Sequence, residues 1–273
     1  MAKLRGIYND KTIEKRIKEG RGFGEGKKYL PWITTRDFPS QGRCSDIRGW
    51  KTNRVHNMFS DLETRYFYTL EYASNVIDIR EQFPLFDDNI SINETMEIAE
   101  ALGINYPIVP NTNTPNVQTT DFLLSVNDNG KSVIKARTVK YSDELTKERS
   151  IEKLEIERIF WERRGVDWKI VTERDIDLVY SFNVEFVHNA YSLNGSNLDA
   201  EKVFYIEDAL LIELSQNSMT LSKLTQNIDK KLGLPPGESL FCIKHLIANK
   251  KWQIDMKKKI NTGDIFSPTK ISH

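Results

Sequence analysis

The chain has 273 residues, of which 39% are hydrophobic and 10% aromatic, and this composition predicts a globular protein with a sizeable core and two domains. Its 39 basic and 39 acidic residues give a formal charge of zero, which excludes a global attraction to nucleic acid or to an acidic membrane. No apolar run approaches the roughly 20 residues of a membrane span, and no apolar N-terminal segment suggests secretion. Cys44 and Cys242 show neither CxxC spacing nor a Cys/His metal pattern, so we expect a reducing, cytoplasmic setting.

The N-terminal part of the chain is rich in glycine and basic residues. A short helix is expected at residues 12–19, followed by GRGFGEGKKYLPW at residues 20–32. These glycines follow a helix rather than a strand, and their spacing fits neither a phosphate loop nor a dinucleotide-binding fingerprint. We therefore expect a basic segment that touches phosphates or a partner, not a nucleotide site.

A helix with a clear start is predicted by SDLETRYFYTLEYASN at residues 60–75. Ser60 is the expected N-cap, and Glu63 three residues later completes a capping box before an apolar periodic run. In that role the side chain of Glu63 bonds the backbone N–H of Ser60, and no catalytic function is needed to explain it. Glu63 also shares a helical stripe with Phe67 and Leu70, which favours a carboxylate that faces the interior.

Strand signals come next. VIDIREQFPL at residues 76–85 predicts a strand, and a short helix is expected near residues 93–102. A β-hairpin is then predicted in TTDFLLSVNDNGKSVIKARTVKYSD, residues 119–143, because the turn sequence NDNG at residues 127–130 separates two β-rich runs.

Two opposite charges are expected at one end of this hairpin. Asp121 shares a face of the first strand with Leu123 and Ser125, while Lys140 ends the less charged face of the second strand. A carboxylate and an ammonium are thus predicted beside a partly buried sheet surface. In the alternative interpretation, Asp121 caps a turn and Lys140 only extends past the end of the sheet.

A long, charged amphipathic helix is predicted at residues 143–164, before a strand in WKIVT at residues 168–172. The order is therefore helix, strand, hairpin, helix, strand. Such alternation favours an α/β fold in which helices pack on the faces of a mixed sheet.

The pattern changes after about residue 177 and becomes mainly helical. Residues 219–260 predict a helix, a Gly/Pro turn, a second helix and a basic strand, which is a winged-helix pattern. Six lysines and one acid lie between residues 240 and 260, so this segment is locally basic. We predict domains at residues 1–178 and 179–273.

The order of the charged groups points to a chemistry. Glu63 lies on a helix, Asp121 on a strand, and Lys140 at the end of the next strand. Two carboxylates suit Mg²⁺ or Mn²⁺, which hold a phosphate and polarise a water. A lysine beside them either stabilises the charge that builds on phosphorus or, with a tuned pKa, orients or deprotonates the water. The constellation indicates phosphodiester hydrolysis.

A hairpin of the form D…xxK after a helix that carries Glu63 resembles the PD-(D/E)xK nucleases, whose restriction-endonuclease-like core has the order αβββαβ. The chain resembles the TnsA endonucleases of heteromeric cut-and-paste transposases more closely. This resemblance covers nearly all of residues 12–175, and the winged-helix-like C-terminal part agrees with it. The motifs that carry it are RIKEGRGFGEGKKYLPWITT, KTNRVHNMFSDLE, DIREQFPL, TTDFLL and ERSIEKLEIERIFWERRG.

The resemblance implies a role for each charged residue. Glu63 and Asp121 take the positions of the metal-binding acids, Lys140 that of the catalytic lysine, and Glu157 that of a supporting active-site acid. For Glu157 the pattern alone is equally compatible with a solvated charge beside Arg158 on the long helix.

Two positions depart from the general nuclease pattern. Thr120 precedes Asp121 where proline is typical, and Thr138 occupies the (D/E) position, which TnsA proteins tend to fill with glutamine. A threonine supplies no carboxylate, so the number of metal ligands is in question rather than the reaction type. The backbone carbonyl of Val139 is expected to reach the metal.

The resemblance also implies partners. TnsA-type proteins cut the 5′ ends of a transposon, while a TnsB-type DDE transposase recognises the DNA ends and performs 3′ cleavage and joining. A TnsC-type AAA+ ATPase regulates both. Zero net charge fits an enzyme that a partner delivers to DNA. The C-terminal domain is expected to contact the regulator or the DNA.

Two other functions are compatible with the same residues. A stand-alone restriction or repair nuclease would cut DNA without a partner. A non-catalytic winged-helix DNA-binding adaptor would have lost its metal chemistry, with Thr138 as the mark of that loss. The joint presence of Glu63, Asp121 and Lys140 argues against the adaptor.

Overall fold

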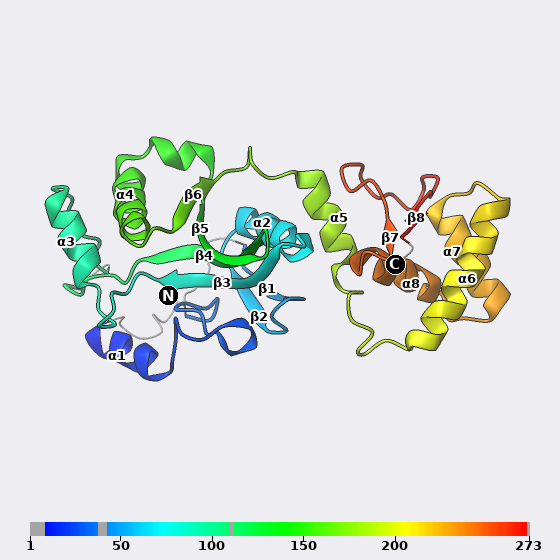
Figure 1. The fold of residues 1–273 in the computed structure, drawn as a ribbon, viewed down its shortest axis with the longest axis horizontal. Coiled ribbons are helices and arrows are strands. Elements are labelled where there is room, and N and C mark those ends of the chain that lie inside the picture. Colours follow the sequence, from blue (N-terminus) through cyan, green and yellow to red (C-terminus); the bar gives the residue numbers. More distant parts are fainter. Residues whose placement is uncertain (1–8, 38–42, 110–111, 272–273) are drawn as a thin grey trace, which may run out of the picture. The chain divides into compact units, whose positions relative to one another are not determined.

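The computed structural model describes residues 9–37, 43–109 and 112–271. The chain divides into two units, Met1–Ile176 and Asp177–His273 (Figure 1). The first unit contains the larger sheet, and the second is mainly helical.

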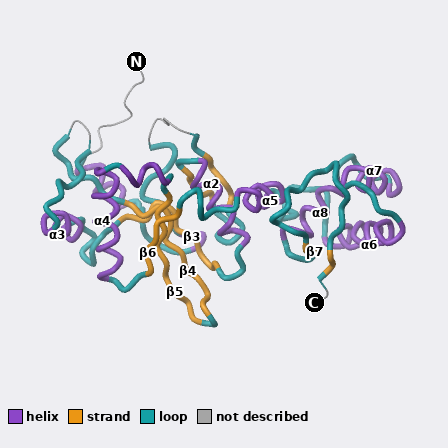
Figure 2. Tube along the Cα trace, turned by 90° about the horizontal axis from the view of Figure 1, so that it is seen from above, coloured by secondary structure: helices purple, strands orange, loops and turns teal. Residues whose placement is uncertain are grey.

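The sheet of the first unit has four strands in the order β3-β4-β5-β6. Figure 2 draws the strands in orange. These strands are β3 Val76–Pro84, β4 Thr119–Asp128, β5 Lys131–Val139 and β6 Asp167–Val171. β3, β4 and β5 pair antiparallel, whereas β6 joins β5 in parallel. The chain thus forms the mixed sheet that its alternating pattern predicts.

The turn between β4 and β5 sets the register of the hairpin. Asn129 and Gly130 connect the strands with φ angles of 51° and 85°. Both angles lie in the left-handed region, which asparagine and glycine adopt more readily than other residues. Because the turn fixes the pairing, Asp121 and Lys140 lie at the same end of the hairpin.

Helices and a second, two-stranded sheet complete the described part of the first unit. The elements are α1 Asp10–Lys18, η1 Gly26–Lys28, β1 Ser45–Arg48, β2 Val55–Met58, α2 Asp61–Tyr72, α3 Asn93–Ala101, η2 Ser142–Thr146 and α4 Glu148–Arg163. The series α2, β3, β4, β5, α4, β6 follows the expected order αβββαβ, with α3 inserted between β3 and β4. Sequence analysis did not predict the β1-β2 hairpin.

Helices cover both faces of the four-stranded sheet. α3 and α4 pack on one face through a buried cluster that includes Leu123 of β4 and Phe160 of α4. α2 covers the other face, where Tyr66 meets Phe122 edge-on with 5.6 Å between ring centroids. Phe122 and Leu123 are consecutive strand residues and point to opposite faces, so they separate the two helical layers.

The long helix begins later than its pattern predicts. The prediction placed it at residues 143–164, but α4 begins at Glu148, after the 3₁₀ helix η2. Lys147 between them is extended, with φ −87° and ψ 118°. The N–H of Ser142 donates to the carboxylate of Glu173 at 2.9 Å, and its hydroxyl donates to the same group. Ser142 at the start of η2 is thus tied to a residue beyond β6, and the extended Lys147 separates η2 from α4.

The second unit consists of α5 Leu178–His188, α6 Ala200–Gln216, α7 Leu221–Leu232, α8 Glu238–Ala248 and the short strands β7 Trp252–Gln253 and β8 Thr269–Lys270. α7 ends at Gly233, whose φ of 64° is a left-handed helix cap. Asp229 joins α7 to α8, because its carboxylate accepts the N–H of Gly237 at 2.7 Å and that of Ser239 at 2.9 Å. The helix, turn, helix and short strand follow in the predicted order, and the winged-helix assignment stays a prediction.

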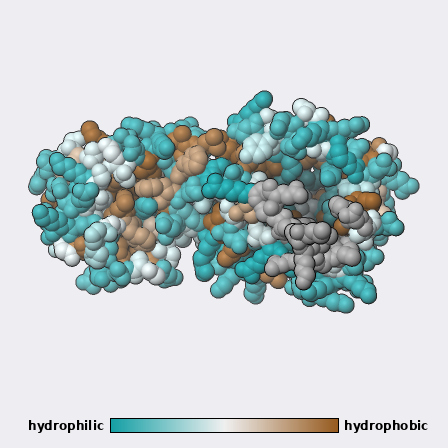
Figure 3. All heavy atoms as spheres, turned by 180° about the vertical axis from the view of Figure 1, so that it is seen from behind, coloured by the Kyte–Doolittle hydropathy of each residue, from teal (hydrophilic) through white to brown (hydrophobic). Residues whose placement is uncertain are grey.

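Hydrophilic residues cover most of the face drawn in Figure 3, with hydrophobic residues scattered among them. Each unit buries its large apolar side chains, for example Phe67 and Phe122 in the first unit and Leu224 and Trp252 in the second. Within the three described ranges, no helix has the length and apolar character needed to cross a membrane.

Candidate active site

Glu63 lies in the first turn of α2, where it is 7% exposed. Ser60 is the N-cap, and its hydroxyl oxygen accepts the N–H of Glu63 at 3.1 Å, as the capping box predicts. The carboxylate accepts the N–H of Phe59 at 3.1 Å and the hydroxyl of Ser60 at 3.0 Å, instead of the expected backbone N–H of Ser60. The cap therefore fixes the orientation of a buried carboxylate.

Asp121, Val139 and Lys140 lie together at the end of the β4-β5 hairpin. Oδ2 of Asp121 accepts the N–H of Val139 at 2.8 Å and Nζ of Lys140 at 3.0 Å. The same ammonium donates to the carbonyl oxygen of Val139 at 3.0 Å. The interpretation in which Asp121 caps a turn and Lys140 only extends past the sheet is wrong, because Asp121 lies within β4 and the two side chains form an ion pair.

Glu157 is buried on the inner face of α4, so its interpretation as a solvated charge is also wrong. Its Oε1 accepts the hydroxyls of Thr120 at 2.6 Å and Thr138 at 2.5 Å. The two hydroxyl oxygens accept the indole N–H groups of Trp161 at 2.6 Å and Trp168 at 3.1 Å, respectively. The two threonines that depart from the nuclease pattern therefore share a structural task, which is to orient the carboxyl group of Glu157.

Two buried acids of the site hold their protons more tightly than usual. Burial, together with the negative charge of Asp121, raises the pKa of Glu63 from 4.5 to about 7. Burial also raises the pKa of Glu157 to about 7, although hydrogen bonds from Thr120 and Thr138 oppose the shift. Because both pKa values lie near neutral pH, an additional positive charge in the site would shift both acids towards their ionised form.

Lys140 keeps its positive charge. Burial disfavours the ammonium, but the nearby carboxylates of Asp121 and Glu63 outweigh this effect and raise the pKa of Lys140. A lysine with a raised pKa is a poor general base for water at neutral pH. The geometry favours the other role that the sequence allows, the stabilisation of negative charge on phosphate oxygens.

A cavity of about 460 Å³ lies beside these groups. Asp121, Thr138, Lys140 and Glu157 line it, together with Lys153, which precedes Glu157 by one turn of α4. Its volume is within the range of cavities that bind small ligands. The cavity thus offers two cations and two acids to a phosphate group.

The structure brings two of the three expected metal ligands, Asp121 and Val139, together. The ammonium of Lys140 bonds both Oδ2 of Asp121 and the carbonyl oxygen of Val139, so it stands where a cation would meet two of these ligands. The third expected ligand, Glu63, is near enough to Asp121 for the charge of Asp121 to contribute to the raised pKa of Glu63. Among the described residues, no three His, Cys, Asp or Glu side chains form a metal-binding group. Two carboxylates and a carbonyl nevertheless form the hard oxygen set that suits Mg²⁺.

A mixed sheet with helices on both faces, an aspartate and a lysine paired at the end of its hairpin, and a buried glutamate on the preceding helix fit the core of an α/β nuclease. Comparisons with known proteins identify the family. Residues 73–173 match the family model described as TnsA-like endonuclease N terminal, and residues 175–256 match TnsA endonuclease C terminal. The chain is 36% identical over 249 residues to the Transposon Tn7 transposition protein TnsA of Escherichia coli, across 91% of this chain and 87% of that protein. It belongs to the TnsA family of transposon endonucleases, as its motifs indicate.

Lys153 and Gln82 contribute to the site but are not among the site residues predicted from the sequence. Nε2 of Gln82 lies 3.4 Å from Oδ1 of Asp121. The sequence signal is three successive polar residues, Arg80, Glu81 and Gln82, within an expected strand, because at least one of them must face a covered side of the sheet; the structure buries all three. Polar side chains rarely occupy buried strand positions unless they have partners.

Proposed function

We propose that this protein is a Mg²⁺-dependent DNA endonuclease, the subunit of a heteromeric transposase that cuts the 5′ strands at the transposon ends. Mn²⁺ is expected to replace Mg²⁺. The observation that carries the proposal is the convergence of Asp121, Val139 and Lys140 near Glu63 in a chain of the TnsA family.

Each residue of the site has a proposed role. Glu63, Asp121 and the carbonyl of Val139 hold the cation. When bound, the cation neutralises charge on the phosphate and lowers the pKa of the attacking water. Lys140 is partly exposed beside the cavity, so with a cation in its place between Asp121 and Val139 its ammonium is available to bind an oxygen of the scissile phosphate and to stabilise the charge of the transition state. Glu157, with a pKa of about 7, holds or releases a proton at the cavity wall near neutral pH.

The proposed partners are transposon-end DNA, a TnsB-type DDE transposase and a TnsC-type AAA+ ATPase. The TnsB-type protein recognises the ends and performs 3′ cleavage and joining, and the ATPase regulates both enzymes. We propose that the second unit is a winged-helix-like domain that contacts the regulator or the DNA. Exposed lysines after α8 support the DNA contact, namely Lys251, Lys257, Lys258 and Lys259.

The test is strand-specific cleavage of DNA that carries the element ends, with the TnsB-type and TnsC-type partners present and with Mg²⁺, Mn²⁺ or a chelator. The wild-type protein is compared with Asp121→Ala, after circular dichroism has shown that both are folded. We expect 5′-strand cuts with the wild type, metal and partners, and none with Asp121→Ala.

Two results would favour other functions. Cutting without partners would indicate a stand-alone nuclease. An absence of 5′-strand cuts, despite 3′ cleavage by the partners and a folded protein, would indicate a non-catalytic adaptor.

A further inference from the structure

Gln82 has an unusual backbone for its place in the fold. Its φ is 50°, in the left-handed region that side chains with a Cβ atom disfavour. Among the described residues other than glycine that have a positive φ, Gln82 is the one inside a strand, and the rest lie outside helices and strands. Such strain persists where the surrounding contacts impose it, and it is often found at functional sites.

In this backbone conformation, Gln82 makes hydrogen bonds through both its main chain and its side chain. Its backbone carbonyl accepts the N–H of Trp32 at 3.2 Å. Its side chain is buried, and Oε1 accepts the hydroxyl of Thr119 at 3.0 Å while Nε2 donates to Oδ1 of Asp121 at 3.4 Å. Both the oxygen and the nitrogen of the amide therefore make a hydrogen bond, and the nitrogen bonds the carboxylate of Asp121 in the active site.

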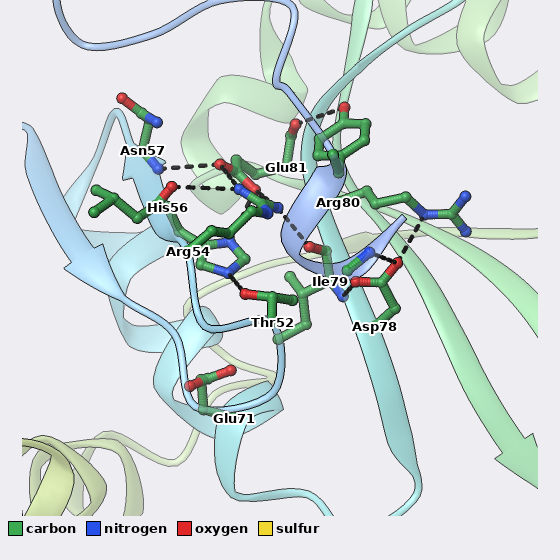
Figure 4. A network of polar contacts seen from close by, with 12 residues as sticks. Thr52, Arg54, His56, Asn57, Glu71, Asp78, Ile79, Arg80 and Glu81 are labelled. Carbon is green, nitrogen blue, oxygen red and sulfur yellow. Dashed lines mark hydrogen bonds and ion pairs between the residues drawn. The ribbon is translucent and has the colours of Figure 1, made fainter. Parts of the chain in front are cut away.

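The preceding residue, Glu81, anchors this part of β3 (Figure 4). Its carboxylate accepts Nη1 and Nη2 of Arg54 at 2.7 and 2.5 Å, Nδ1 of His56 at 2.8 Å and the N–H of Asn57 at 3.2 Å. Its backbone carbonyl accepts the hydroxyl of Tyr29 at 3.0 Å. With Glu81 held in this way, the next residue has little freedom to relax into an ordinary strand conformation.

The strand opposite Gln82 also departs from regular geometry. Thr120 bonds Glu157 of α4, and Leu123 joins the cluster packed against the same helix, although strict alternation would place these two residues on opposite faces. Asp121 lies between them, and the ladder pairs Glu81 with Phe122 and Phe83 with Thr120 on either side of Gln82 and Asp121. The carboxylate of Asp121 is held by Gln82 on one oxygen and by Lys140 on the other.

We propose that Gln82 is a positioning residue of the active site: its amide holds Oδ1 of Asp121 so that Oδ2 stays aligned with the carbonyl of Val139. It acts through Asp121 and does not touch the reacting atoms. The inference rests on the proposed function, since its purpose is the orientation of a metal-binding carboxylate.

The most specific test is the substitution Gln82→Gly, because it removes the side chain while glycine still adopts the left-handed backbone. Binding of Mn²⁺ to the full-length protein without DNA is measured by titration calorimetry, alongside thermal unfolding. We expect the Kd for Mn²⁺ to rise at least about 10-fold, as is typical when a residue that orients a metal ligand is lost, while Tm stays close to that of the wild type. In the cleavage assay, the Mn²⁺ concentration for half-maximal rate should rise by a similar factor, and excess Mn²⁺ should restore most of the rate.

Asn53→Gly is the matched control, since Asn53 also has a left-handed φ, of 53°, but bonds Arg48 on the surface. It should leave the Kd for Mn²⁺ unchanged. A folded Gln82→Gly protein that binds Mn²⁺ within twofold of the wild type would overturn the inference and leave the proposed function intact. A wild-type protein that neither binds Mn²⁺ nor cuts DNA would overturn both.

Discussion

Replacing Glu81 by glutamine removes the negative charge around which Arg54 and His56 are buried. Glu81 is 1% exposed, and the side chains of Arg54 and His56 are 8% and 0% exposed. These groups join the β1-β2 hairpin to β3, so the charge lies at the contact between two parts of the first unit. In Glu81→Gln the buried guanidinium keeps its charge and loses its counterion, which is the costly way to break a buried ion pair.

The size of the effect follows from the pKa of Glu81. Burial opposes its charge, but the charges and hydrogen bonds of His56 and Arg54 outweigh burial and lower the pKa from 4.5 to about 2. At about 1.4 kcal/mol for each unit of pKa, the ionised form contributes about 3 kcal/mol to the free energy of unfolding at neutral pH. Since the folded-state pKa is the lower one, this stability is present above about pH 4.5 and is lost as the pH falls towards 2.

Urea unfolding followed by tryptophan fluorescence measures the effect, because Trp32, Trp50, Trp161 and Trp168 all lie in the first unit. Glu81→Gln should lose about 3 kcal/mol at neutral pH, and the difference from the wild type should shrink below about pH 4.5. The control is Glu162→Gln, which removes an exposed partner of Arg158 and should cost less than about 1 kcal/mol. A loss below about 1 kcal/mol in Glu81→Gln, or a difference that does not change with pH, would refute the reasoning.

Three further predictions concern the cavity. Lys140→Ala should lower the single-turnover rate of 5′-strand cleavage by about 100-fold or more while the protein stays folded, because the ammonium next to the phosphate is lost; a rate within threefold of the wild type would contradict this. Thr138→Val leaves the N–H of Trp168 without its acceptor and removes one donor to Glu157, so unfolding experiments should show a loss of about 1–3 kcal/mol, whereas Thr138→Ser should behave like the wild type. Lys153→Ala should weaken DNA binding and make the slope of log K for DNA binding against log salt concentration shallower by about the value of one phosphate contact, and Lys153→Arg should bind like the wild type. Fluorescence anisotropy titrations at several salt concentrations measure this slope, and an unchanged slope in Lys153→Ala would exclude a phosphate contact.

The sequence by itself determined the features that depend on short stretches of chain. The capping box placed the start of α2 at Ser60, and Asn129-Gly130 placed the hairpin turn, because caps and tight turns are set by residues three or four positions apart. The hairpin register then brought Asp121 to Lys140. The order of these residues, with the motifs around them, was enough to indicate the TnsA family, which the comparisons confirm.

The tertiary structure alone decided the features that depend on distant contacts. The sequence could not show that Thr120 and Thr138 would both bond Glu157, since the three residues come from β4, β5 and α4. It could not place the start of α4 either, because the preceding segment forms the 3₁₀ helix η2 and Ser142 at its start bonds Glu173, which lies beyond β6.

Gln82 shows the physical reason most directly. Its local sequence predicts a regular strand, and a left-handed backbone is unfavourable for a residue with a Cβ atom. Contacts with Trp32, Thr119 and Asp121, far away along the chain, outweigh this preference only after the sheet has formed. Local patterns thus determine which elements form, whereas the packing of those elements determines where each carboxylate of the active site points.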